Sequence, residues 1–409
     1  MSFQTGLSGL NASSKSLDVI GNNIANANTV GMKSSRAEFA DLVASSLGSG
    51  GGGAGAGIGV AVATIAQQFS QGNINITGNS LDVAINGNGF FEVARPDGST
   101  AFTRDGQFKL DKDGNIITNT GAKVMGYTTD ITTGVPTSVT PAPLTVPTSA
   151  PIPANPTTAI TAEFNLDARV PTATPLTSPT QYGTSLTTYD SQGVAIPLSL
   201  YFVKSGVDTW SAFTDPTVAQ TAVTSSNYAT RSFQMTFSPT GVLTAPLVNP
   251  TMTLTSPNPN IGAFTANLDV SKVTQFGVGF NVSNLSQDGY TAGELTGISI
   301  EPSGVITTRY SNGETQYRGQ LALADFRNVQ GLTPIGSGEY LETFVSGQPV
   351  LGNPGIGKYG ELRAGAVEES NVDLTAELVN MMTAQRNYQA NAQTIKTQDQ
   401  IMSTLVNLR

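Results

Sequence analysis

The chain has 409 residues, only 12% of them charged, and a net charge of −9 at pH 7. It has no cysteine and no histidine, which excludes disulfides and thiolate chemistry and removes the commonest general base and metal ligand. Because the chain is acidic and carries few charges, it lacks the positive charge that would attract nucleic acid or an anionic membrane. Catalysis by carboxylates alone survives this argument, but most other enzyme classes do not. We expect no cofactor, no metal site, no catalytic site and no nucleic-acid or membrane partner.

Residues 1–30 are predicted to form a helix with an apolar residue at every seventh position. This front stripe consists of Phe3, Leu10, Leu17 and Ile24, with Leu7 on the partner position. Ser14 and Gly21 interrupt it. Apolar residues at heptad spacing stay on one face only when the helix packs against another helix.

Residues 31–71 are predicted to be a linker region with a short helix at residues 36–46. Residues 48–57 within it are almost all glycine. Such a tract has no packing surface and behaves as a flexible coil, either a plain loop or a hinge between the helical end and the rest of the chain.

From residue 72 the apolar period changes to two, which predicts β-structure. Asp-Gly pairs at residues 97–98, 105–106 and 113–114 stand between short strand-like runs and predict type I′ hairpin turns. We expect a first β-domain built from residues 72–147 and 286–364. An outer β-domain, residues 148–285, would be inserted into it behind a proline-dense stretch that suits edge strands and domain crossings.

Residues 365–409 are predicted to form the second terminal helix, which residues 370–373 open as a capping box. Its back stripe consists of Leu374, Met381, Tyr388, Ile395 and Met402, with Leu378 beside it. The predicted fold is multidomain and mainly β, with two β-rich domains, one inserted in the other, and terminal helices that pair in a coiled-coil-like domain. The two stripes require each other, or copies of themselves in neighbouring molecules, as in an assembly protein.

The first residues show no basic segment followed by an apolar run and no cleavage site, so we expect no cleaved signal peptide. The longest apolar stretch, residues 58–66, is too short to span a bilayer. We expect a chain that stays in the cytoplasm or leaves by a route without a cleaved signal.

Several segments resemble the bacterial flagellar rod and hook proteins. Residues 23–33 are similar to the amino-terminal motif of that family, and residues 377–388 to its carboxyl-terminal motif. Residues 78–87 and 102–106 are similar to the family's first β-domain. The resemblance marks the following motif residues: Asn26, Asn28, Thr29, Gly31, Lys33, Gln385 and Arg386.

Residues 188–193, 310–325 and 331–371 resemble the hook-forming members in particular. The resemblance implies a structural subunit of the hook that polymerises into a helical tube and acts as a flexible universal joint for motor torque. It implies an extracellular location at the flagellum, reached through the type III export apparatus without signal cleavage. It also implies partners, namely further copies of this chain, the distal rod protein, the hook cap and the hook–filament junction proteins.

The sequence also leaves other functional interpretations open. One is a distal rod or other flagellar axial protein, which shares both ends but is shorter and lacks the inserted domain. Another is a secreted β-rich adhesin. A third is a glycan hydrolase that uses carboxylates such as Asp105 or Glu314, although a glycan cleft is usually rich in aromatic residues and this chain has one tryptophan.

Overall fold

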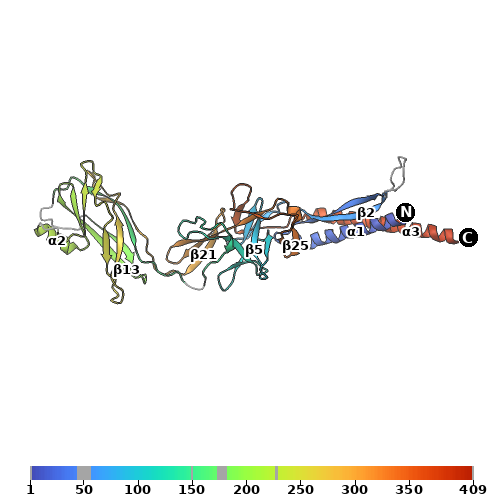
Figure 1. The fold of residues 1–409 in the computed structure, drawn as a ribbon, viewed down its shortest axis with the longest axis horizontal. Helices are drawn as coiled ribbons and strands as arrows, with labels where there is room; N and C mark the ends of the chain where they lie inside the picture. The colour runs from blue at the N-terminus through green and yellow to red at the C-terminus, as the bar shows by residue number, and fades with distance from the viewer. Residues whose placement is uncertain (1, 44–56, 149–150, 173–181, 226–228, 408–409) are drawn as a thin grey trace. The chain divides into compact units, whose positions relative to one another are not determined.

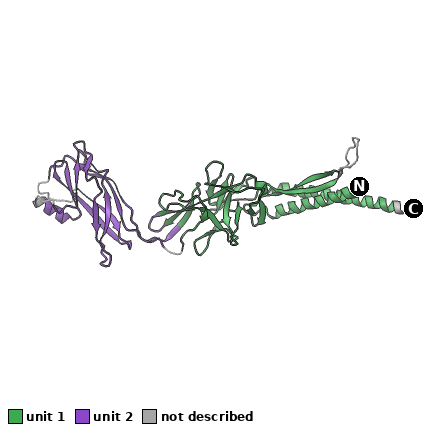
Figure 2. Ribbon diagram, viewed as in Figure 1, with its two compact units in different colours: residues 1–149, 297–309, 315–409 green, residues 150–296, 310–314 purple. Residues whose placement is uncertain are grey.

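The computed structural model describes residues 2–43, 57–148, 151–172, 182–225 and 229–407 (Figure 1). The chain forms two compact units (Figure 2). Unit 1 comprises residues 1–149, 297–309 and 315–409, and unit 2 comprises residues 150–296 and 310–314. The prediction of a mainly β, multidomain chain with one β-rich part inserted in another and a helix at each end is confirmed.

The two terminal helices of unit 1, α1 (Ser2–Ala25) and α3 (Leu374–Asn407), pack side by side in opposite directions. Gly6 faces Ile395 near one end of α1, and Asn23 faces Glu377 near the other. A Cβ atom at Gly6 would lie 3.2 Å from Cγ1 of Ile395, so glycine allows a close approach of the helices here. Asp373, rather than Ser370, caps α3, because its Oδ1 accepts hydrogen bonds from the backbone N–H groups of residues 375 and 376.

A β-hairpin lies against α1. Its strands are β1 (Ser35–Val43) and β2 (Gly57–Gln67), paired antiparallel. The short helix expected at residues 36–46 is therefore wrong over its described part. The strand forms because β2 supplies its hydrogen-bond partners, and this pairing joins segments on either side of the glycine tract. Residues 48–56 of that tract lie outside the described residues, and Gly57 begins β2.

The body of unit 1 is a sheet that joins 13 described strands. The order along its main path is β21 (Leu295–Ile300), β22 (Val305–Tyr310), β23 (Thr315–Leu321), β9 (Lys123–Tyr127), β5 (Phe90–Ala94), β6 (Thr100–Thr103), β26 (Glu339–Leu341) and β25 (Thr333–Gly336). The strands off this path are β7 (Lys109–Leu110), β8 (Ile116–Ile117), β10 (Ala142–Pro143), β24 (Leu323–Asp325) and β27 (Val350–Gly352). Edge-to-face aromatic contacts among Phe90, Phe326 and Tyr340 fill one part of the core.

Two small sheets connect this body to the terminal helices. In one, β4 (Val83–Asn86) pairs with β28 (Glu361–Ala364). In the other, β3 (Ile74–Ile76) pairs with β29 (Ala366–Glu368), the last strand before α3. Each pair joins an early segment to a late one, so the strands that follow the β1–β2 hairpin meet the strands that precede α3.

Unit 2 contains two five-stranded sheets around one core. The first has β17 (Thr251–Leu254), β18 (Phe264–Asp269), β11 (Ala159–Asp167), β19 (Thr274–Phe276) and β20 (Asn281–Gln287). The second has β12 (Gly183–Tyr189), β13 (Ala195–Gly206), β14 (Thr209–Phe213), β15 (Phe233–Phe237) and β16 (Leu243–Ala245), with α2 (Pro216–Ser225) beside it. Trp210 is fully buried in the core and donates its indole N–H to Oε1 of Gln275 at 2.9 Å.

The three Asp-Gly pairs differ in structure. Gly98 and Gly114 have positive φ in turns that connect β5 to β6 and β7 to β8, so those two hairpins are confirmed. Their aspartates do not have positive φ, so the turns are not type I′. The hairpin expected at Asp105-Gly106 is wrong, because Gly106 instead accepts a hydrogen bond from the backbone of Val83.

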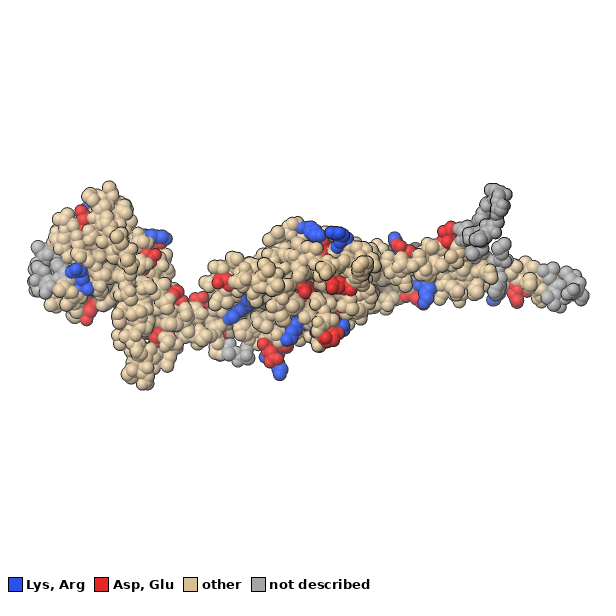
Figure 3. All heavy atoms as spheres, in the orientation of Figure 1, with Lys and Arg blue, Asp and Glu red and all other residues tan. Residues whose placement is uncertain are grey.

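The surface carries few charges, and Lys and Arg are interspersed with Asp and Glu on the face shown in Figure 3. No helix in the described part of the chain combines the length and the apolar character that crossing a membrane demands.

One carboxylate in the main sheet is buried without compensation. Glu92 on β5 is 9% exposed, and within the described residues its Oε2 has no hydrogen-bond partner. Burial, together with the negative charge of Glu342, raises the pKa of Glu92. A raised pKa in the folded state means that stability is present below the pKa of the unfolded chain and is lost as the pH rises through the folded value.

We therefore expect Glu92→Gln to raise the melting temperature at pH 7, with a gain on the order of 1 kcal/mol in the free energy of unfolding. The gain should vanish at a pH below the ordinary glutamate pKa, where the carboxyl group is protonated in both states. Thermal unfolding of both chains at the two pH values measures this. Glu361→Gln, at an exposed position of β28, is the matched control and should change neither value. An equal gain at both pH values would show that the ionised carboxylate is not its source.

Candidate assembly interface

The back stripe is only partly covered within one chain. Ile395 is half-buried against α1 and Met381 is also half-buried, while Leu374, Leu378, Tyr388 and Met402 are exposed. Leu374 and Met402 are exposed because α3, with 34 residues, extends past both ends of α1, which has 24. As an interface between copies of the chain, the back stripe remains a prediction.

The front stripe is not the most buried face of α1. Leu10, Leu17 and Ile24 are half-buried and Leu7 is exposed, whereas Ala12, Val19, Ile20 and Asn23 are buried. The buried face is shifted because α1 packs against the β1–β2 hairpin as well as against α3. The side chain of Phe3 lies outside the described residues.

A second apolar surface lies on the side of α3 that faces away from α1. It consists of Leu378, Val379 and Met382, which we call the outer patch, and each of these side chains is about half exposed. At about 100° per residue, these positions lie roughly 100–200° around the helix from Glu377 and Ile395, which face α1. Three clustered apolar side chains left in water on one helix face form a candidate interaction surface.

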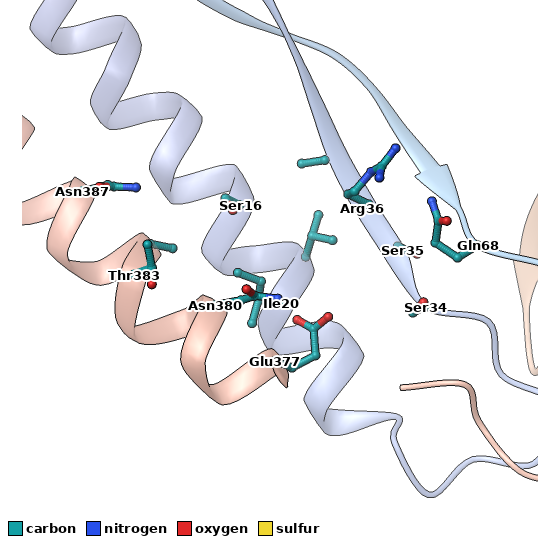
Figure 4. Close-up of a pocket in the computed structure, with 13 residues that line it drawn as sticks. Ser16, Ile20, Ser34, Ser35, Arg36, Gln68, Glu377, Asn380, Thr383 and Asn387 are labelled. Atoms are coloured by element: carbon teal, nitrogen blue, oxygen red, sulfur yellow. The ribbon is translucent and has the colours of Figure 1, made fainter. Parts of the chain in front are cut away.

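A groove of about 430 Å³ lies between α1, α3 and β1 (Figure 4). Ser16 and Ile20 of α1, Asn380 of α3 and Arg36 of β1 line it. Glu377 of α3 also lines it, and Oε2 of its carboxylate is buried with no hydrogen-bond partner among the described residues. Its Oε1 lies 3.5 Å from Nδ2 of Asn23.

A buried ion cluster anchors these helices to the β-structure. Nζ of Lys33 lies 2.6 Å from Oε1 of Glu368, and Nη1 of Arg104 lies 3.1 Å from Oε2 of the same carboxylate. Lys33 also donates to the backbone oxygen of Ser70 at 2.7 Å, and the N–H of Gly72 donates to Glu368. Burial lowers the pKa of Lys33 and of Arg104, and the charge of Glu368 opposes that change at both. One carboxylate thus holds two cations that come from distant parts of the sequence.

Gly31 shows why a glycine stands two residues before that lysine. Its φ is +70°, and a Cβ atom there would lie 2.6 Å from the backbone nitrogen of Asp105. Its N–H donates to the backbone oxygen of Glu368 at 2.8 Å. Any side chain would separate the residue 31 loop from the first β-domain.

The other motif residues lie outside the ion cluster. Asn26, Asn28 and Thr29 are in the turn after α1, where Nδ2 of Asn26 donates to the backbone oxygen of Asn22 at 2.9 Å. Gln385 and Arg386 are exposed on α3. None of these five positions contacts the cluster through a hydrogen bond that the described structure shows.

Two asparagines that the sequence did not single out as site residues complete the anchor. Asn23 is buried, accepts from the N–H of Ser35 and donates to its carbonyl oxygen, so it ties α1 to β1. Asn371 accepts from the N–H of Ser34 at 2.7 Å and donates to the backbone oxygen of Gln68. Glu368 was not predicted to be a site residue either, because the sequence of its strand resembles that of any other buried strand.

Asp105, one of the two carboxylates considered for catalysis, is half-buried. Burial raises the pKa of Asp105, and its Oδ1 accepts from the N–H of Gln107 at 3.0 Å. Glu314 belongs to unit 2 and Asp105 to unit 1. In the described part of the chain, acidic residues do not gather in groups of three or more that could hold a metal ion.

Four family models match consecutive parts of the chain. They are the flagella basal body rod protein over residues 3–33, the flagellar hook protein FlgE/F/G D1 domain over residues 84–161, the flagellar basal body protein FlaE D2 domain over residues 165–290, and the flagellar basal body rod FlgEFG protein C-terminal over residues 363–408. The N-terminal and C-terminal matches cover the helices that pair in the structure.

Whole-length relatives agree with these matches. The flagellar hook protein FlgE of Salmonella typhimurium is 41% identical over an alignment 424 positions long, which covers 100% of both chains. That of Escherichia coli is 40% identical over the same coverage, and that of Rhizobium meliloti is 32% identical over 100% of this chain and 98% of its own. A crystal structure of the Helicobacter pylori flagellar hook protein FlgE2 shares the fold, with a TM-score of 0.51 and 16% identity over 70% of this chain and 98% of that one. The chain therefore belongs to the flagellar hook protein FlgE family.

Proposed function

We propose that this chain is the structural subunit of a bacterial flagellar hook, polymerises into a helical tube, and serves as a flexible universal joint that transmits motor torque to the filament. The observation that carries the proposal is the apolar surface of α3 that one chain leaves in water, the outer patch together with the ends of the back stripe. An interface between two different surfaces of identical subunits is heterologous, and it builds a helical polymer when the rotation between neighbours does not close a ring.

The composition supports the bending role. A tube that bends as it rotates must exchange contacts between subunits at small energetic cost. With 12% charged residues, the surface has few ion pairs to break when neighbouring copies slide. Within one subunit, in contrast, the connection should be rigid. The buried ion cluster of Lys33, Arg104 and Glu368 supports a firm connection between the helices and the first β-domain.

Family membership supports the remaining parts of the proposal. The chain works outside the cell in the hook and reaches it through the type III export apparatus without a cleaved signal. Its partners are further copies of itself, the distal rod protein, the hook cap and the hook–filament junction proteins. Its role is structural rather than catalytic.

We expect the purified full chain to form tubes visible by electron microscopy under polymerising conditions, whereas residues 68–373, without the terminal helices and the hairpin, stay monomeric. The shortened chain should still melt cooperatively, because both β-units have cores of their own. Tubes formed by residues 68–373 would show that the β-units rather than the helices drive assembly. A full chain that forms no polymer would contradict the proposed function.

A further inference from the structure

A short loop of unit 1 holds an apolar side chain entirely in water. Phe344 is 103% exposed, and the neighbouring Val345 is 67% exposed. Both lie between β26 and β27, in the segment 343–347, which we call the knob loop. An aromatic side chain offers roughly 150–250 Å² of surface for burial, so a phenylalanine that touches nothing in its own chain is an unusual feature of a folded domain.

The knob loop is held firmly. Oγ1 of Thr343 donates to the backbone oxygen of Gly331 at 2.6 Å and accepts from the N–H of Val345 and of Ser346. Ser346 is buried, and its Oγ accepts from the N–H of Thr343 at 2.9 Å. Nδ2 of Asn328 donates to the backbone oxygen of Val345. A loop ordered in advance loses little conformational freedom when it binds, which favours a role in recognition.

The same unit has an apolar pocket of about 370 Å³. Its apolar lining includes Tyr127, Pro136, Val139, Leu351, Ile356 and Tyr359. The ring of Tyr359 fits there because residue 352 is glycine, where a Cβ atom would lie 2.2 Å from Cε2 of that ring. Val139 is 91% exposed at the pocket rim and Ile356 is 62% exposed, so the pocket also presents apolar surface to water.

The knob and the pocket are separate surfaces of one unit. The strand that leads into the knob loop, β26, is three strands from β9, which carries Tyr127, a separation of roughly 14 Å at the usual spacing between strands. Because Phe344 is fully exposed, it does not occupy the pocket of its own chain. A contact between them therefore needs two copies.

Charge around the two surfaces is complementary. The exposed Glu342 lies two residues before Phe344. Lys358 lies between Ile356 and Tyr359 of the pocket, where it pairs with Asp325 and remains 58% exposed. The knob thus has a carboxylate beside it, and the pocket has a partly exposed ammonium group beside it.

We propose that Phe344 of one copy inserts into the Tyr127–Tyr359 pocket of the next copy, which rests on the proposed function as a polymer. When each copy gives its knob to one neighbour and its pocket to another, the contact is heterologous and repeats along a helical assembly. The occupant of the pocket is thus a second copy of this chain.

Removing the ring tests the energy of this contact. Phe344→Ala should raise the critical concentration for polymerisation of the full chain about tenfold or more, with no change in the melting temperature of the monomer, because the side chain is exposed there. Leu247→Ala in unit 2, also at a side chain that is 94% exposed, is the matched control and should change neither. An unchanged critical concentration for Phe344→Ala would overturn the proposal.

The absence of cysteine makes the geometry testable by cross-linking. Val345→Cys beside the knob and Ser138→Cys on the pocket lining leave Phe344 and the apolar lining in place. When polymer of the double variant is oxidised, a ladder of covalent dimers, trimers and larger species should appear on a non-reducing gel, and neither single variant should cross-link. Polymer that forms normally without a ladder would overturn the contact and leave the proposed function standing. Dimers from Val345→Cys alone would mean that knobs meet each other, which also overturns it.

Discussion

Leu378→Asp is expected to abolish polymerisation of the full chain while leaving the melting temperature of the monomer nearly unchanged. The side chain is 51% exposed in the single chain, so the aspartate stays hydrated there. In the polymer the outer patch is expected to be covered by a neighbouring copy, and the buried, unpaired charge would cost several kcal/mol at each contact. Sedimentation and electron microscopy measure polymer, and thermal unfolding measures the monomer.

A matched control distinguishes the effect of the mutated position from the effect of the added negative charge. Val207→Asp makes the same chemical change at an apolar side chain of unit 2 that is 83% exposed, and it should polymerise normally. Loss of polymer in both variants would mean that added negative charge, rather than the outer patch, is responsible. Normal tubes from Leu378→Asp would show that this face of α3 is not an interface.

The Ile395→Asp variant should behave differently from Leu378→Asp. Ile395 is half-buried against α1 beside Gly6, so a charge there disturbs the pair of helices within one chain as well as contacts between chains. The sequence showed the heptad spacing but did not show which apolar residues face α1 and which face a neighbour. Two of the three residues of the outer patch, Val379 and Met382, are not on the back stripe. The heptad spacing therefore does not reveal this exposed apolar surface.

The hairpin was the largest feature of the fold that the sequence did not reveal. Residues 35–43 become a strand because residues 57–67 pair with them across the glycine tract, and strand pairing depends on such non-local partners more than on intrinsic preference. The same hairpin packs on α1 and moves its buried face from Leu10 and Leu17 to Val19 and Ile20. The nested β-units, in contrast, were predictable, because a period of two and recurring turn residues are local signals.

The structural role of Lys33 could not be predicted from the sequence either. Its resemblance to a family marked Gly31 and Lys33 as important without a physical reason. The reason is a carboxylate 335 residues further along the chain, which pattern and composition cannot place next to a lysine. Only the fold shows that the motif lysine is fully buried and paired.

Replacing that carboxylate should be among the most destabilising single changes in unit 1. Glu368→Gln leaves Lys33 and Arg104 as two buried cations with no counter-charge between them, which is expected to lower the free energy of unfolding by about 3–5 kcal/mol. The amide oxygen can still accept hydrogen bonds, but the NH₂ group that replaces the other carboxylate oxygen would face a cation. Urea unfolding of the full chain measures the loss, and Glu361→Gln at an exposed position seven residues earlier should change little.

A double variant tests whether the loss comes from the buried charge. Lys33→Met with Glu368→Gln removes one of the stranded cations, so its cost should be clearly smaller than the sum of the two single costs, as for residues that interact directly. Additive costs, or a cost below about 1 kcal/mol for Glu368→Gln, would contradict the assignment of the ion cluster as the anchor. If the anchor works as described, variants that fold but weaken it should also assemble poorly, since the helices of the proposed interface would no longer be fixed to the β-structure around them.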